Sequence, residues 1–173
     1  MGHGKVTVPS PRSFGSATEA ACGSAVLNEL TADLTGPIEN SVKVEDADFN
    51  ATACPLFFCR GAAIEDNLDN IQQFSPGEIV NMQVDIVVRH TGLANVSVVD
   101  LANQNIIGDF LFDWPVYANQ SLTAAQAPAN ETNFNVTIPD LGTQCSEAGA
   151  CALQWWWLGD GDQTYESCVD FTQ

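Results

Sequence analysis

The clearest pattern in the chain is a strict alternation of hydrophobic and polar positions after the turn signal Ser75-Pro76-Gly77-Glu78. The apolar positions of this segment are Val80, Met82, Val84, Ile86 and Val88. A period of two residues predicts a β-strand that is buried on one face. Thr91-Gly92 ends the segment, so we expect His90 to lie at a sheet edge or a loop mouth.

Shorter segments of similar pattern predict further strands, and clusters of Gly, Asn, Pro and Asp separate them. These segments are residues 5–8, 95–101, 106–112, 133–138, 152–158 and 163–171. Apolar residues at near-helical spacing predict one short helix over residues 18–34, capped by Thr18, whereas residues 38–74 lack a period and predict a long loop. Together the elements predict a mainly β fold, an immunoglobulin- or fibronectin-like antiparallel β-sandwich with long loops.

Length and charge limit the function classes. A chain of 173 residues with 45% hydrophobic residues is long enough to bury one core, so we expect residues 1–173 to form a single, monomeric domain. Five Lys and Arg residues against 22 Asp and Glu residues give a formal net charge of −17. This charge repels nucleic acid and anionic membranes, which we therefore do not expect as partners. A neutral polymer such as a polysaccharide meets no such repulsion.

Cysteines and glycosylation motifs both indicate an extracellular protein. Six cysteines without a Cys-x-x-Cys motif favour a disulfide-stapled, secreted chain over a zinc site. Pairing by proximity gives Cys54–Cys59 and Cys145–Cys151, which leaves Cys22–Cys168 to join the predicted helix to the last strand; other connectivities stay open. Five Asn-x-Ser/Thr motifs are candidate glycosylation sites, at Asn50, Asn95, Asn119, Asn130 and Asn135.

The side chains with metal chemistry are few. The chain has only two histidines, His3 and His90. In the last predicted strand Tyr165 and Gln163 share a face. A histidine at a mature N-terminus offers its amine and a ring nitrogen, and a second imidazole completes a flattened three-nitrogen set that suits copper. We therefore predict one copper ion held by His3, His90 and Tyr165, with the Gln163 amide beside it. Without the histidines, a buried core tyrosine is the simpler interpretation of Tyr165.

Several motifs together resemble a known family. They are His3-Gly4-Lys5-Val6, Pro9-Ser10-Pro11-Arg12, Cys59-Arg60-Gly61, Asp66-Asn67, His90-Thr91-Gly92 and residues 94–100 and 163–171. Spread over nearly the whole chain, they resemble the fungal lytic polysaccharide monooxygenases, most of all auxiliary activity family 16. The resemblance implies a sandwich with a flat copper-bearing face and a catalytic domain. It also implies oxidative cleavage of cellulose at the first carbon of the glucose unit, with dioxygen or peroxide and an external electron donor.

The resemblance assigns His3, His90 and Tyr165 as metal ligands and Gln163 and Tyr165 as catalytic residues. Met1-Gly2 ahead of His3 resembles a cloning remnant, because a mature secreted protein is expected to begin at His3. With this extension the His3 amine is a peptide nitrogen, and we expect the copper site to be impaired. Two alternatives remain: a secreted copper-binding or glycan-binding protein of the same fold without catalysis, and a sandwich domain without metal.

Two further features allow other interpretations. The run Trp155-Trp156-Trp157 offers a stacking surface for sugars, but alternation along a strand favours the core for part of it, and we expect Trp156 to be core. The acidic clusters Glu65-Asp66-Asp69 and Asp160-Asp162-Glu166 resemble the carboxylate pairs of glycosidases. In so acidic a chain such pairs arise by chance, so we expect solvated carboxylates and no hydrolysis.

Overall fold

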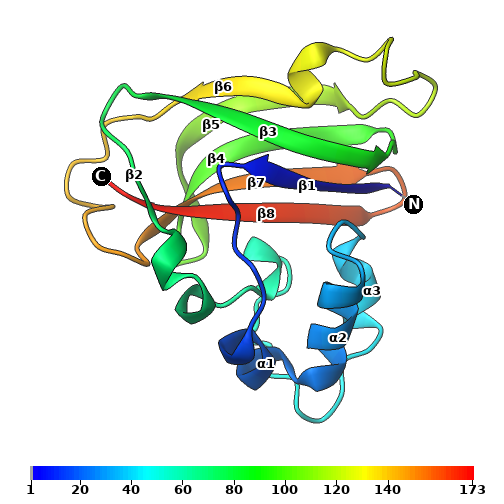
Figure 1. The fold of residues 1–173 in the computed structure, drawn as a ribbon, viewed down its shortest axis with the longest axis vertical. Coiled ribbons are helices and arrows are strands. Elements are labelled where there is room, and N and C mark those ends of the chain that lie inside the picture. Colours follow the sequence, from blue (N-terminus) through cyan, green and yellow to red (C-terminus); the bar gives the residue numbers. More distant parts are fainter. Residues whose placement is uncertain (1) are drawn as a thin grey trace.

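The computed structural model describes residues 2–173, in which two β-sheets pack face to face (Figure 1). One sheet has the order β1-β3-β6 and the other β2-β8-β7-β4-β5. The strands are β1 (His3–Val8), β2 (Gln72–Gln73), β3 (Ile79–Val88), β4 (Gly92–Asp100), β5 (Asn105–Tyr117), β6 (Asn133–Thr137), β7 (Cys151–Gly159) and β8 (Gln163–Thr172). All pair antiparallel except β2 with β8. The predicted β-sandwich is confirmed.

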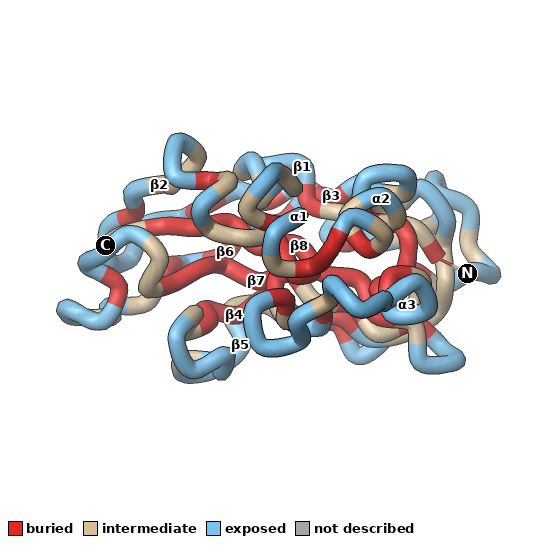
Figure 2. The backbone as a smooth tube through the Cα atoms, turned by 90° about the horizontal axis from the view of Figure 1, so that it is seen from below, coloured by how far each residue is buried: buried red, intermediate tan, exposed pale blue. Residues whose placement is uncertain are grey.

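The hydrophobic core lies between the inner faces of the two sheets. Val80, Met82 and Val84 of β3 are buried there, as their alternation predicts. Trp155 and Trp157 of β7 are fully buried opposite them, and Tyr117 packs edge-on against both rings. Figure 2 shows the buried backbone as a central band between exposed loops. Large aromatic rings thus fill much of the space between the sheets.

Trp156 lies outside this core, and the prediction for it was wrong. In the register of β7 with β4, Trp155 faces Val96 and Trp157 faces Ala94 on the inner side. Trp156 therefore points to the outer face of the five-stranded sheet, where it is half-buried. A run of three identical residues does not show which parity faces the partner sheet, and only the pairing decides it.

A layer of short helices lies along β8, below the strands in the view of Figure 1. It contains α1 (Ser16–Cys22), α2 (Ser24–Ala32), α3 (Ile38–Val42) and the 3-10 helices η1 (Cys59–Gly61), η2 (Ile64–Asp66) and η3 (Leu68–Asn70), while η4 (Ala129–Glu131) precedes β6. The predicted long loop over residues 38–74 is thus only partly irregular. None of the helices in residues 2–173 is long and apolar enough to cross a membrane.

The single helix predicted over residues 18–34 is two helices. Gly23, between α1 and α2, has φ +80°, a left-handed conformation that interrupts the helix. The predicted cap, Thr18, lies inside α1, and the side chain that caps this helix is Asp66. Its carboxylate accepts hydrogen bonds from the backbone N–H groups of Gly15, Ala17 and Thr18 at 2.8–3.0 Å. Asp66 is thus a structural group rather than a solvated acid.

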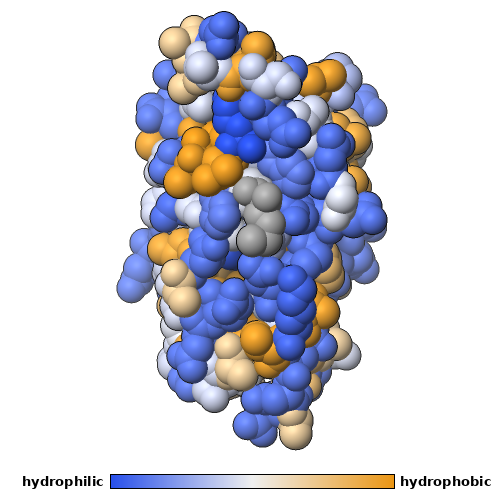
Figure 3. All heavy atoms as spheres, turned by 90° about the vertical axis from the view of Figure 1, so that its right-hand side faces the viewer, coloured by the Kyte–Doolittle hydropathy of each residue, from blue (hydrophilic) through white to orange (hydrophobic). Residues whose placement is uncertain are grey.

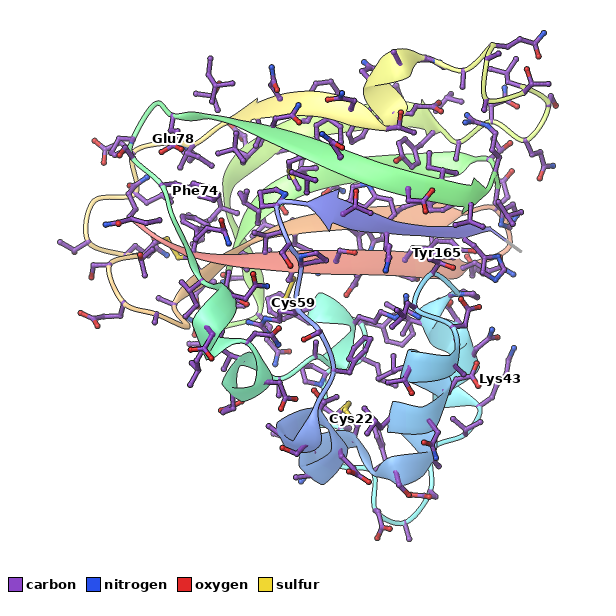
Figure 4. The ribbon with its side chains drawn as sticks, in the orientation of Figure 1. Cys22, Lys43, Cys59, Phe74, Glu78 and Tyr165 are labelled. Atoms are coloured by element: carbon purple, nitrogen blue, oxygen red, sulfur yellow. A yellow bond between two sulfur atoms is a disulfide. The ribbon has the colours of Figure 1, made fainter. Side chains whose placement is uncertain are left out.

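Two of the three predicted disulfides were wrong. The structure contains Cys145–Cys151, as predicted, together with Cys22–Cys54 and Cys59–Cys168 in place of Cys54–Cys59 and Cys22–Cys168. Although Cys54 and Cys59 are close in sequence, they belong to different clusters. Cys54 packs with the apolar residues of α1 and α2, whereas Cys59 packs on the outer face of β8. Figure 4 shows Cys59 next to β8 and Cys22 farther out in the helical layer.

The glycosylation motifs differ in exposure. Asn50, Asn130 and Asn135 are exposed and Asn119 is half-buried. Asn135 alternates with buried Phe134 and Val136 on β6, in agreement with its predicted outward direction. Asn95 is only 7% exposed in the central strand β4, so the folded chain does not present it as an acceptor. The tripeptide motif alone gives no sign of this burial.

Candidate metal centre

The N-terminal end of β1 meets the ends of β7 and β8 at one corner of the sandwich. A Cβ atom built on Gly2 would lie 2.7 Å from His90 Cβ and 3.0 Å from the Tyr165 hydroxyl oxygen. One built on Gly159 would lie 3.0 Å from His90 Nδ1. Figure 4 shows Tyr165 at this end of β8. His90 and Tyr165, far apart in sequence, therefore both lie beside Gly2.

His3 reaches the same corner through its backbone, while its ring points elsewhere. Gly2 and Gly4 are buried, and His3 between them is half-buried on the opposite face of β1. Consecutive Cα atoms are about 3.8 Å apart, so the backbone nitrogen of His3 follows directly on the residue that touches His90 and Tyr165. The His3 ring forms a 2.9 Å hydrogen bond from Nε2 to Asp33 Oδ2. Its Nδ1 is buried and has no hydrogen-bond partner within residues 2–173.

The loop after α2 holds Asp33 in place. Asp33 Oδ1 accepts hydrogen bonds from the backbone N–H and the hydroxyl of Thr35 at 3.1 and 3.0 Å. The backbone N–H of Gly4 donates to the Thr35 carbonyl, which ties the loop to β1. Burial opposes ionisation of Asp33, but the two Thr35 hydrogen bonds and the nearby His3 outweigh it and lower the Asp33 pKa. Asp33 is therefore a carboxylate at neutral pH.

Arg60 supports this loop from the side of β8. Its buried guanidinium donates to the carbonyls of Asp33 and Leu34 at 2.7 and 3.0 Å, and its backbone N–H donates to Glu166 Oε2. Burial lowers the Arg60 pKa, against the effect of the neighbouring carboxylates Asp33 and Glu166. Sequence reasoning gave neither Asp33 nor Arg60 a role at the site. They lie 30 and 57 positions from His3. Arg60 belongs to the motif Cys59-Arg60-Gly61, but that motif gave it no contact with His3 or Asp33.

Tyr165 is held as a neutral phenol. Its ring stacks on Trp157, its cross-strand partner, with centroids 4.2 Å apart. Its hydroxyl donates to Gln163 Oε1 at 3.0 Å, so the predicted pair on β8 is in contact. Burial raises the pKa of Tyr165 to about 12. At neutral pH the group offers a phenol oxygen rather than a phenolate.

His3 and His90 are the side chains that would hold a copper ion at this end of the sandwich. A ring nitrogen bound to a carboxylate, with the other ring nitrogen unpaired, is the usual state of an imidazole that binds a metal, and His3 has it. His90 Nδ1 is likewise buried without a partner among the described residues. Within residues 2–173 no group of three or more His, Cys, Asp or Glu side chains is placed to hold a metal ion. The two imidazoles are nitrogen donors, a ligand type that suits copper.

Comparisons with known proteins extend this description. No protein-family model and no curated protein matches the chain. Among solved structures it is similar to an AA10 lytic polysaccharide monooxygenase from Streptomyces lividans, with 18% sequence identity and a TM-score of 0.53 over 99% of this chain and 100% of that one. The chain has a lytic polysaccharide monooxygenase-like fold. A chitin binding domain from Burkholderia pseudomallei also matches, with 13% identity and a TM-score of 0.44 over 99% and 100% of the two chains.

Proposed function

We propose that the chain, in a form that begins at His3, is a secreted, monomeric, copper-dependent lytic polysaccharide monooxygenase, most similar to auxiliary activity family 16. It cleaves cellulose or a related β-glucan oxidatively at the first carbon of the sugar, with dioxygen or peroxide and an external electron donor. Copper, when bound, supplies the activation of oxygen for hydrogen abstraction. The chain supplies the ligands, their orientation and the surface that meets the polysaccharide.

The observation that carries the proposal is the hydrogen bonding of the His3 ring. Its Nε2 is bound to Asp33, its Nδ1 has no hydrogen-bond partner among the described residues, and its backbone follows directly on Gly2, which lies against His90 and Tyr165. A histidine that is only structural has no need of a buried ring nitrogen without a partner, which costs free energy. The AA10-like fold supports the same interpretation. When the chain begins at His3, the amine becomes a third nitrogen beside the two imidazoles.

Two residues of β8 have proposed roles at the corner. The Tyr165 phenol, protonated at neutral pH, would be an oxygen ligand of the copper, and the Gln163 side chain would be a hydrogen-bonding group beside it. The end of the molecule where β1 begins is largely hydrophilic, with small dispersed apolar patches (Figure 3). A polar face of this kind meets a neutral polysaccharide mainly through hydrogen bonds, and the acidic chain places no charge penalty on that contact.

A second candidate function is copper or glycan binding without catalysis, and one observation favours it for the chain that begins at Met1. Gly2 lies against His90 and the Tyr165 hydroxyl. The His3 nitrogen is then part of a peptide bond. In this form the two imidazoles would remain as ligands, but the free amine would be lost.

The test is an assay of soluble oxidised oligosaccharides from cellulose. A protein that begins at His3, loaded with copper and given ascorbate and oxygen, is expected to release products oxidised at the first carbon. The matched His90→Ala variant and the chain that begins at Met1 are expected to release fewer by at least about 100-fold, because each lacks one nitrogen of the ligand set. Tight copper binding at His3 and His90 without any oxidised product would instead support the non-catalytic function.

A further inference from the structure

The outer face of the five-stranded sheet contains a pocket of about 300 Å³, away from the core side on which Tyr165 lies. Phe57, from the loop between α3 and η1, and Phe110, from β5, line it together with Trp156. Phe57 and Phe110 are 53% and 51% exposed, and Trp156 is half-buried. Three aromatic rings therefore remain available to a ligand, in a pocket at the small end of the usual ligand-site range.

The strand register places polar side chains between these rings. Glu166 of β8, Trp156 of β7 and Asn95 of β4 form one row across the sheet. Two positions along, Gln154 of β7 lies opposite Ser97 of β4 in the next row on the same face. All five line the pocket. The floor thus combines two amides, a hydroxyl and a carboxyl group with one indole ring.

These polar groups are buried without being fully used. Asn95, Ser97, Gln154 and Glu166 are 7%, 1%, 7% and 2% exposed. Glu166 Oε2 accepts from the backbone of Arg60, but Glu166 Oε1 is buried and has no partner within residues 2–173. Buried polar groups normally have partners, so the unpaired Oε1 of Glu166 indicates a ligand that supplies one.

We propose that this pocket is a binding site for a neutral sugar unit of a soluble oligosaccharide. A pyranose ring has an apolar face that packs on aromatic rings and hydroxyl groups that bond to amide, hydroxyl and carboxyl groups. No Lys or Arg lines the pocket and the chain carries a net charge of −17, so the site repels an anionic ligand. Neutral, hydroxyl-rich ligands remain as the class that fits both the rings and the polar floor.

The pocket is independent of the candidate metal centre. Tyr165 faces the core and Glu166, the next residue on β8, faces the opposite side of the sheet. None of the residues that line the pocket is a proposed copper ligand. Sugar binding here therefore requires no copper, and it is measured without any assay of oxidation.

The glycosylation motif at Asn95 decides how the protein must be made for the test. A glycan attached to Asn95 before folding would occupy this same pocket, because the Asn95 side chain lines it. The full chain is therefore produced in a host without N-glycosylation and kept metal-free with a chelator.

The experiment is a titration with short gluco-, manno-, xylo- and chito-oligosaccharides, observed through the indole N–H of Trp156 by NMR. The other three tryptophans are buried at 6%, 0% and 0% exposure, so this signal is expected to shift most. At least one sugar should give a saturable shift. Trp156→Ala and Phe57→Ala should each raise the Kd for that sugar about tenfold or more. Binding to Trp156→Ala, which lacks the indole signal, is measured by calorimetry. The matched control Ile79→Ala, on an exposed site of the other sheet, should leave the Kd unchanged.

Glu166→Gln separates the sugar from a cationic ligand. The variant keeps a hydrogen-bonding group of similar shape, so sugar binding should weaken by less than about tenfold. Two results would overturn the proposal. One is that no sugar shifts the Trp156 signal, or that the Kd of a bound sugar is the same in both aromatic variants as in the wild type. The other is binding of choline in place of sugars, abolished by Glu166→Gln, which would assign the aromatic rings to a cation.

Discussion

At the scale of single residues, Asp33 decides how His3 presents its ring. We expect Asp33→Asn, in a protein that begins at His3, to weaken copper binding about 10- to 100-fold, because the anionic partner of Nε2 is lost while an acceptor for Thr35 is kept. Competition titration with a copper chelator measures this change. The exposed Asp69→Asn serves as the control of equal charge change. Equal affinities in both variants would remove Asp33 from the site.

Glu166 makes stability depend on pH. Burial raises its pKa from 4.5 to about 8, although the Arg60 backbone and the Gln154 side chain favour the charged form. Because the folded pKa lies above the unfolded one, the contribution of Glu166 is fully present below pH 4.5 and is lost as the pH rises to about 8. The free energy of unfolding of wild type, relative to Glu166→Gln, should therefore fall over this range in urea titrations. A difference that is constant with pH would contradict the assignment.

At the scale of elements, α1 depends on a cap from a distant turn. Asp66 accepts hydrogen bonds from three backbone N–H groups at the start of the helix and from the Thr18 hydroxyl. Asp66→Ala should lower the free energy of unfolding by about 1–2 kcal/mol in urea titrations. Glu65→Ala, at the exposed neighbouring position, should have little effect.

The Asp66 cap is also sensitive to acid. Burial opposes its ionisation, but hydrogen bonds from Ala17, Thr18 and Gly15 outweigh burial and lower its pKa below 3.8. Its contribution is therefore present at neutral pH and is lost as the pH falls through that lowered pKa. Equal stabilities of wild type and Asp66→Ala at neutral pH would show that the cap contributes nothing.

The disulfides should differ in their contributions. Cys59–Cys168 spans 109 positions and joins the helical layer to β8, whereas Cys145–Cys151 spans 6. In the entropic model, replacing both cysteines of the long bridge by Ala costs about 4–5 kcal/mol, against about 2 kcal/mol for the short one. Denaturant unfolding of the two double variants measures the difference. A larger loss from the short bridge would contradict the chain-entropy argument.

Sequence periodicity predicted the strands well because a half-buried strand must alternate, as β3 does. The sequence-based predictions failed where the structure depends on contacts between residues far apart in the chain. Gly23 divides the helix through its positive φ, which a spacing pattern does not reveal. The pairing of Cys22 with Cys54 depends on which apolar cluster each sulfur joins, and proximity in sequence was a poor substitute.

At the scale of the whole molecule, the sequence predicted some residues of the candidate site and missed others. His90 and Tyr165 were proposed from the scarcity of histidines and from the resemblance of their motifs, and the fold places both beside Gly2. Asp33 and Arg60 depend on how the helical layer packs against β1 and β8, which no local pattern encodes. The outer pocket likewise depends on the register of β4, β7 and β8. The sequence motifs thus identify some residues of the site, and the remaining contacts depend on long-range packing.

The central claim is that His3 and His90 bind one copper ion together. The most direct test is calorimetric titration of copper into three proteins: the chain that begins at His3, its His90→Ala variant and the chain that begins at Met1. We predict one tight site per molecule in the first and a loss of affinity of at least about 100-fold on His90→Ala. In the third, any copper bound by the extended N-terminus should not depend on His90. Equal affinities of the first two proteins would contradict the account.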